Sequence, residues 1–207
     1  MWHQGECKKC PAGFYCQNEG TSDDFTLCPY GYYCPEQSID PIICPVGTYN
    51  PTKGAKSFEW CLDCPPGQYC RNIGTNETSG LCSAGFFCSK LSIEAEPLAK
   101  DLKEDPPRWG PCLAGHYCPE GTAYPFKCPI GTYNPVEKST RIDDCLPCDP
   151  GHYGESTGLI VSTCTGKCSP GHICTGKATI PSPLRDTGAI CREGTFCPAG
   201  SIVEIPC

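Results

Sequence analysis

The sequence has little of what enzymes and membrane proteins are usually built from. Its 207 residues include one Met and four His, and no apolar run approaches the roughly 18 residues that a membrane-spanning helix needs. No ordered Ser, His and Asp set, paired-carboxylate site or Gly-rich phosphate loop stands out, so we expect neither an enzyme nor a bound cofactor. The net charge of −7 argues against nucleic acid or an anionic lipid surface as the main partner.

The opening residues, MWHQGEC, lack the basic and apolar stretches of a secretory signal. Cysteine, by contrast, is abundant, because 22 Cys in 207 residues is roughly 11%, a level typical of secreted disulfide scaffolds. A reducing cytosol would leave these thiols open. We therefore expect an extracellular segment of a longer polypeptide, either secreted or on a cell surface, with a flagellar surface among the alternatives.

A Cys-x-x-Gly-x-aromatic motif organises the chain and occurs ten times. Where Pro follows the first Cys, it presets φ for position i+1 of a β-turn, and Gly at i+3 suits a type I turn. The aromatic residue, which is Ile173 in one copy, is expected to lie beside the disulfide and to form a miniature core with it. The copies open at Cys10, Cys28, Cys44, Cys64, Cys82, Cys112, Cys128, Cys148, Cys168 and Cys191.

These motifs predict small disulfide-rich modules in tandem, with short β-ribbons and turns and little helix, in an elongated rod-like array. The cysteine spacing repeats and divides the sequence into residues 1–60, 61–144 and 145–207. The second repeat contains an insert, residues 89–111, in which a short helix and a solvated charged loop are the alternatives. The first and third repeats are truncated at the ends of the sequence.

Three motif copies lack a Cys at the closing position, and a lone cysteine follows each of them. We pair these as Cys44–Cys61, Cys128–Cys145 and Cys148–Cys164. The other seven copies close on themselves or interlace with a neighbour, and spacing does not decide between the two. Interlacing gives Cys10–Cys28 with Cys16–Cys34 and Cys168–Cys191 with Cys174–Cys197, and it leaves one copy, Cys112–Cys118, to close on itself. Both schemes leave Cys7 and Cys207 over, with partners outside the segment or in a second copy of the chain.

The stretches CPVGTYNPTKGAKSFEWCLDC (44–64) and CPIGTYNPVEKSTRIDDCLPC (128–148) resemble the cysteine-rich repeat named for ephrin-type receptor tyrosine kinases. The cysteine order from Cys44 to Cys88 is similar to a tumour-necrosis-factor-receptor domain, and that resemblance implies Cys44–Cys61, Cys64–Cys82 and Cys70–Cys88. The CPAGFYC-type copies resemble repeat arrays in large surface proteins, including those of flagellar hairs (mastigonemes). The resemblance implies a module class that serves receptors, adhesins and fibres alike.

The remaining polar residues favour structural roles over metal sites. The Cys-x-x-Cys pairs lie 54 and 84 residues apart, farther than a zinc site needs, and His116, His152 and His172 follow the motif glycine at a variable position, so we expect no metal. Asn76-Glu77-Thr78 is an N-glycosylation sequon.

The sequence as a whole predicts an extracellular stalk or filament segment. Its partners are neighbouring repeats or subunits and glycans, and it has no membrane span and no nucleic acid. The alternative is a receptor or adhesin ectodomain that binds a protein ligand near Trp109 and Arg108.

Overall fold

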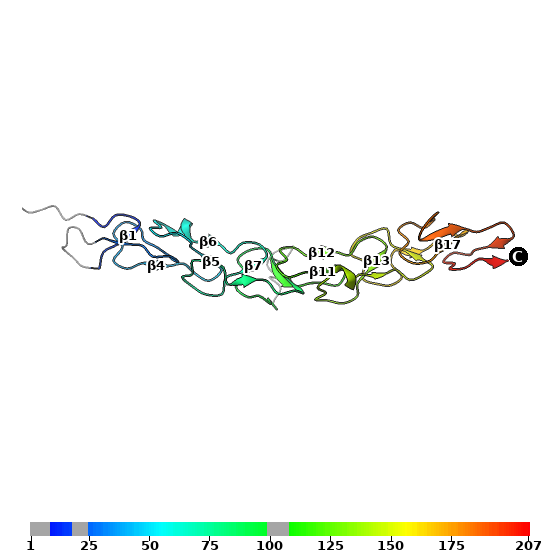
Figure 1. Cartoon of the computed structure of the whole chain (residues 1–207), viewed down its shortest axis with the longest axis horizontal. Helices are drawn as coiled ribbons and strands as arrows, with labels where there is room; N and C mark the ends of the chain where they lie inside the picture. The colour runs from blue at the N-terminus through cyan, green and yellow to red at the C-terminus, as the bar shows by residue number, and fades with distance from the viewer. Residues whose placement is uncertain (1–8, 18–24, 99–107) are drawn as a thin grey trace, which may run out of the picture. The chain divides into compact units, whose positions relative to one another are not determined.

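In the computed structural model, the described residues are 9–17, 25–98 and 108–207. Over these ranges, strands of two or three residues pair two by two and antiparallel (Figure 1). The first strand of each ribbon comes from a motif, and the second ends directly before the next motif or, in the last ribbon, before Cys207. The ribbons are β1 (Phe14–Tyr15) with β2 (Thr26–Leu27), β3 (Tyr32–Tyr33) with β4 (Ile42–Ile43), β5 (Thr48–Tyr49) with β6 (Leu62–Asp63), β7 (Gln68–Tyr69) with β8 (Gly80–Leu81), β9 (Phe86–Cys88) with β10 (Trp109–Pro111), β11 (His116–Tyr117) with β12 (Phe126–Lys127), β13 (Thr132–Tyr133) with β14 (Leu146–Pro147), β15 (His152–Tyr153) with β16 (Gly166–Lys167), β17 (His172–Cys174) with β18 (Gly188–Ile190), and β19 (Thr195–Phe196) with β20 (Ile205–Pro206).

The chain forms two compact units. Unit 1 consists of residues 1–82 and 88–109, and unit 2 consists of residues 83–87 and 110–207. Each unit is a succession of small disulfide-rich modules, as the motif predicts. The three sequence repeats have other boundaries, because they follow cysteine spacing while the units follow spatial contacts.

The turn in each motif lies one residue later than the sequence predicts. In nine copies the residue after the glycine donates its N–H to the carbonyl of the residue after the first Cys, at 3.0–3.3 Å, as from Phe14 to Pro11. Glycine therefore occupies position i+2, and its φ is between 76° and 92° in all ten copies. A positive φ at i+2 is what a type II turn requires, so the expected type I turn is wrong.

Seven motif copies close on themselves. The two Cα atoms of each bridge are 5.8–6.5 Å apart, within the range for a disulfide. The turn brings the two cysteines of one motif together, so that they bond to each other and not to the cysteines of a neighbouring copy. The bridges are Cys10–Cys16, Cys28–Cys34, Cys64–Cys70, Cys82–Cys88, Cys112–Cys118, Cys168–Cys174 and Cys191–Cys197.

This pairing corrects the interlaced scheme. The expected pairs Cys10–Cys28, Cys16–Cys34, Cys64–Cys82, Cys70–Cys88, Cys168–Cys191 and Cys174–Cys197 are not formed. The structure pairs Cys44–Cys61, Cys128–Cys145 and Cys148–Cys164 at the places that the spacing predicts. The first two of these loops contain the short 3₁₀ helices η1 (Phe58–Trp60) and η2 (Ile142–Asp144).

Helix is otherwise absent from the described ranges. Residues 91–98 of the insert form bends and irregular backbone, so the alternative of a short helix is wrong there. Residues 99–107, for which a short helix was also an alternative, lie outside the described ranges.

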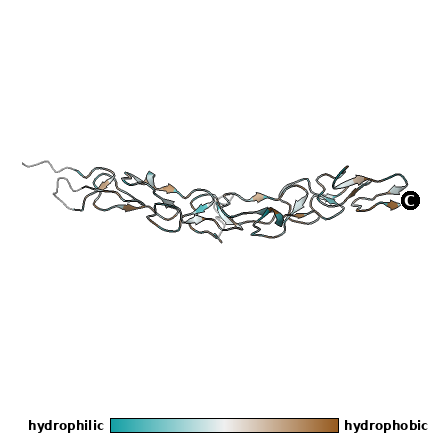
Figure 2. Ribbon diagram, viewed as in Figure 1, coloured by the Kyte–Doolittle hydropathy of each residue, from teal (hydrophilic) through white to brown (hydrophobic). Residues whose placement is uncertain are grey.

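The buried hydrophobic residues are mostly the bridged cysteines, joined by a few alanine and phenylalanine side chains. Many hydrophobic residues of the short strands are exposed, among them Ile42 and Ile43 of β4. Figure 2 shows several of these strands as hydrophobic segments. Two motif rings pack on the bridge of another module, whereas the sequence predicts contact with the bridge of their own. Phe87 packs against Cys112 and Cys118, and Tyr153 packs against Cys168 and Cys174. In both places the ring of one module lies on the bridge of the next, so consecutive modules share a core.

Candidate functional site: the junction between consecutive modules

Nine of the ten motif glycines use both of their backbone groups to hold the next module. Gly13 donates its N–H to the carbonyl of Cys34 at 2.8 Å, and its own carbonyl accepts the N–H of Cys28 at 2.9 Å. We call this pair of bonds the junction. On the next module, the two bonds end at the first Cys of that module's motif and at its closing residue. The closing residue stands three positions after the motif glycine of the same module.

The junction recurs throughout both units. The bonds donated by glycine measure 2.7–3.0 Å and run from Gly13 to Cys34, Gly31 to Asn50, Gly47 to Cys70, Gly67 to Cys88, Gly85 to Cys118, Gly115 to Asn134, Gly131 to Gly154, Gly151 to Cys174 and Gly171 to Cys197. Because only backbone groups take part, the junction tolerates different side chains in different modules.

A second set of bonds follows seven of the closing residues. Three or four positions later, a residue with positive φ donates its N–H to the carbonyl of the previous module's first Cys. Examples are Gln37 to Cys10 at 2.8 Å, Gly74 to Cys44 at 3.0 Å and Lys138 to Cys112 at 2.7 Å. We call this positive-φ residue the tail turn.

The motif glycine is also tightly enclosed by the module after next. A Cβ atom built on Gly131 would lie 2.6 Å from the carbonyl oxygen of Lys177, and one on Gly85 would lie 2.8 Å from that of Lys138. Lys138 is a tail turn, and Lys177 has a positive φ at the equivalent position, three residues after its closing Cys. A side chain at this position would therefore clash with backbone, which has little freedom to move. The motif glycines of the first eight copies are buried, whereas Gly171 is half-buried and Gly194 is exposed, and neither would meet an atom within 4 Å.

Two buried asparagines replace the closing Cys in two of the three copies that lack it, and Gly154 stands there in the third. Asn50 is fully buried, and its Nδ2 donates to the carbonyl of Tyr32 at 2.8 Å while its Oδ1 accepts from Thr52 N at 3.0 Å. Asn134 is 1% exposed, with equivalent bonds to His116 and Val136. Sequence analysis missed this role, although both residues stand at a cysteine position and precede Pro.

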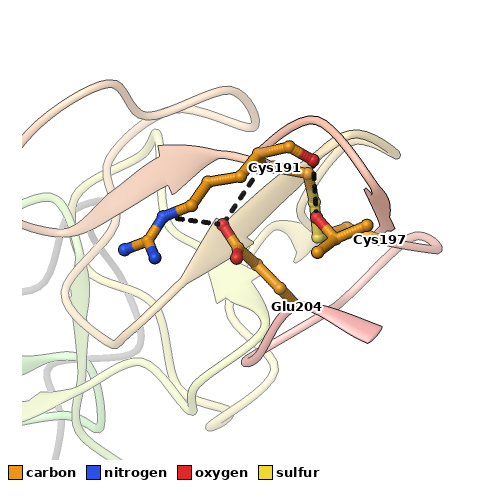
Figure 3. A network of polar contacts seen from close by, with 5 residues as sticks. Cys191, Cys197 and Glu204 are labelled. Atoms are coloured by element: carbon orange, nitrogen blue, oxygen red, sulfur yellow. Dashed lines mark hydrogen bonds and ion pairs between the residues drawn. A yellow bond between two sulfur atoms is a disulfide. The ribbon is translucent and has the colours of Figure 1, made fainter. Parts of the chain in front are cut away.

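The last module has a different environment around its bridge (Figure 3). Glu204 accepts the backbone N–H of Arg192 at 3.2 Å and lies 3.8 Å from its side-chain Nε, beside Cys191–Cys197. Cys207 is exposed and is a free thiol. Its N–H donates to the carbonyl of Gly194 at 3.0 Å, the bond that the first Cys of a motif makes in every junction. Cys7 lies outside the described residues.

Two carboxylates stabilise the long disulfide loops. Asp144 accepts the backbone N–H groups of Thr140 and Arg141 at 2.8 and 3.0 Å, and these bonds hold the pKa of its carboxyl below the usual range. The Ser57 hydroxyl donates to Glu59 and lowers the pKa of that carboxyl in the equivalent loop.

The other predicted site residues lie apart from the junction. Asn76 is exposed in the loop after Cys70. Trp109 is half-buried and lines a small cleft of about 210 Å³ with Ile93, Pro97 and Leu98. The backbone carbonyl of Arg108 accepts the N–H of Ser89 at 2.6 Å. Over the described ranges, no three His, Cys, Asp or Glu residues are grouped so as to hold a metal ion.

No family model matches the chain. The chain is similar to ABC transporter G family member 28 of Arabidopsis thaliana, with 29% identity over 164 residues that cover 76% of this chain and 12% of that protein. It is also similar to the putative white-brown complex homolog protein 30 of the same plant, with 30% identity over 141 residues that cover 61% of this chain and 12% of that protein. The chain thus spans about an eighth of the curated relatives it matches. Among the described residues, no helix has the length and apolar character to span a membrane.

Proposed function

We propose that this chain is an extracellular structural segment, a stack of disulfide-closed modules that serves as a stalk or filament element of a larger protein. The observation that supports this proposal is the junction, which joins each module to the next with the same pair of backbone bonds. A segment built for one catalytic or binding event would concentrate distinctive side chains in one place, whereas here the same contact recurs along both units.

Two further observations support an extracellular location. Ten disulfides require an oxidising compartment. The match to about an eighth of proteins named as a transporter and a white-brown complex homolog fits an accessory part of a larger polypeptide. The module class named for ephrin-type and tumour-necrosis-factor receptors is part of the same proposal, as a surface-protein module.

The second element of the proposal is a covalent partner for Cys207. The backbone of Cys207 already occupies the place of a motif's first Cys, so we expect the Cys207 thiol to bond to a cysteine of another module.

Small-angle X-ray scattering of the exported, oxidised chain tests the stalk. A compact protein of this length has a radius of gyration of about 17 Å. A stack of modules gives a value well above that, and a value near 17 Å would contradict the proposal. Non-reducing peptide mapping of native material tests Cys207. A bridge from Cys207 to another module is expected, and a thiol that stays free in all native material would contradict that element alone.

A receptor or adhesin ectodomain remains the second candidate, favoured by the cleft around Trp109. Its ligand would lie against Ile93, Pro97 and Leu98.

A further inference from the structure

The loop between Cys70 and Cys82 in unit 1 forms a cleft of about 420 Å³, lined by Tyr69, Arg71, Asn76 and Ser79 among others. This volume is within the range of sites that hold small ligands. Hydrogen bonds hold the loop in place. Arg71 N donates to Ser79 Oγ at 3.0 Å, Ser79 N donates to the Tyr69 carbonyl at 2.9 Å, and the Thr78 hydroxyl donates to Gln68 Oε1 at 2.5 Å. The cleft is therefore preformed.

Asn76 is the wall residue whose amide is available. Its side chain is exposed and makes no hydrogen bond to any other described residue. Asn50 and Asn134, by contrast, are buried and hydrogen-bonded. Asn76-Glu77-Thr78 is also the one Asn-x-Ser/Thr sequon without Pro in the 207 residues. The modification signal and the free amide thus coincide in the wall of a preformed cleft.

We propose that Asn76 carries an N-linked glycan and that the first sugar lies in this cleft against Tyr69 and Arg71. This inference rests on the extracellular location proposed above. The donor is an oligosaccharide linked to a polyprenyl diphosphate. The Asn76 amide nitrogen forms a bond to the anomeric carbon, the bond from that carbon to the diphosphate oxygen breaks, the polyprenyl diphosphate leaves, and the nitrogen loses one proton.

The lining suits a sugar on chemical grounds. The Tyr69 ring offers an apolar face to the C–H groups on one side of a pyranose. The Arg71 guanidinium lies 5.9 Å from the centre of that ring and donates hydrogen bonds, which sugar hydroxyls accept. Glu77 at the rim accepts hydrogen bonds from hydroxyl groups.

Unit 2 contains a matched loop without a sequon. There Glu155 N donates to Thr165 Oγ1 at 3.1 Å and Thr165 N donates to the Tyr153 carbonyl at 2.9 Å, the two bonds that Arg71, Ser79 and Tyr69 make in unit 1. Tyr153 thus corresponds to Tyr69, but Glu155 stands in place of Arg71. Ile160, two residues after the tail turn Gly158, corresponds to Asn76 and is 52% exposed. Because Ser162 follows, the substitution Ile160→Asn moves the sequon to this loop.

The experiment uses the full chain secreted from eukaryotic cells in four forms. These are wild type, Thr78→Ser, Arg71→Glu, and the double variant Asn76→Gln with Ile160→Asn. Intact mass gives glycan occupancy, and thiol counting on the same samples gives the number of disulfides. A peptide N-glycosidase is then added to the native chains and to reduced, denatured chains, and the rate of glycan release is followed by mass.

We expect wild type and Thr78→Ser to carry a glycan on Asn76. Release from native wild type is expected to be about 2- to 5-fold slower than from native Arg71→Glu or the double variant, the factor that one partly exposed contact is worth. All forms should release at one rate after denaturation. Thr78→Ser retains the hydroxyl to Gln68, so it should behave as wild type.

An exported, fully bridged chain with Asn76 unmodified would overturn the inference while the proposed function stands. Equal native release from all forms would overturn the placement of the sugar in the cleft. A chain retained in the cell with open thiols would contradict the proposed function itself, and this inference with it.

Discussion

Replacement of Gly131 by Ala should damage the stack far more than the same change at Gly194, although both residues occupy the same motif position. Both have φ near 80°, at 76° and 80°, and a non-glycine residue there costs about 1–2 kcal/mol. At Gly194 the added Cβ meets nothing within 4 Å, so this conformational cost is the whole effect.

At Gly131 two further costs apply. The Cβ would lie 2.6 Å from the carbonyl oxygen and 3.1 Å from the carbonyl carbon of Lys177, so backbone must shift. The shift weakens the bonds from Gly131 N to the Gly154 carbonyl (2.8 Å) and from Cys148 N to the Gly131 carbonyl (3.0 Å), each worth about 0.5–1.5 kcal/mol. The sum is about 2–5 kcal/mol for Gly131→Ala against about 1–2 kcal/mol for Gly194→Ala.

Amide hydrogen exchange of the oxidised chain is the suitable assay, because a repeat array need not unfold in one step. The Cys148 amide is expected to exchange at least about tenfold faster in Gly131→Ala, since 1.4 kcal/mol corresponds to a factor of ten. Amides of unit 1 serve as the internal control. Equal effects of the two substitutions would refute the view that the module after next encloses the motif glycine.

Three further predictions concern other residues. Asn134→Ala leaves the His116 carbonyl and the Val136 N–H without their partner, so denaturant unfolding should show a free energy of unfolding lower by about 2–4 kcal/mol. The control Asn72→Ala, at an exposed position, should change it by no more than about 0.5 kcal/mol. Similar losses in the two variants would contradict the structural role of Asn134. The pKa of Asp144 is lower in the folded chain than its usual value, so its stabilising effect is present above the unfolded pKa of about 4 and is lost as pH falls through the folded value. Asp144→Asn should therefore flatten the acid dependence of stability, by under about 1 kcal/mol because the carboxylate is screened by solvent, and an unchanged acid profile in urea unfolding would count against this. Trp109→Ala should leave export and the radius of gyration unchanged if the chain is a stalk, while loss of binding to a cell surface or ligand in a pull-down would favour the receptor alternative.

The class of fold could be predicted from the sequence because Cys, Gly and Pro carry strong local constraints. The ten motifs located ten turns, and the three copies without a closing Cys identified Cys44–Cys61, Cys128–Cys145 and Cys148–Cys164. The seven remaining bridges were left open because spacing alone allows both schemes. The turn geometry that decides them, with Gly at i+2, lies one residue from the position predicted.

The junction was beyond sequence analysis for a physical reason. Backbone N–H and carbonyl groups are the same in every residue, so a contact made by Gly31 with Asn50 leaves no side-chain pattern. The ring of Phe87 on the Cys112–Cys118 bridge was assigned to the wrong module for a related reason, because a motif shows which groups are available and not which module they contact. The sequence analysis gave Asn50 and Asn134 no structural role, although their shared position in the motif was a usable signal.

The enclosure of motif glycines such as Gly31 by the module after next has a consequence for how the chain is made. A ribosome delivers the modules in order, and the bridges within single motifs, six residues apart, can form as soon as each motif reaches an oxidising lumen. Gly31, however, obtains its enclosure only when residue 74 has emerged. In such modules the disulfide within the motif can therefore form about two modules before the glycine of that motif is enclosed. Early closure within a motif oxidises both of its thiols before distant cysteines enter the lumen. It thereby limits mispairing among the 22 cysteines during biogenesis.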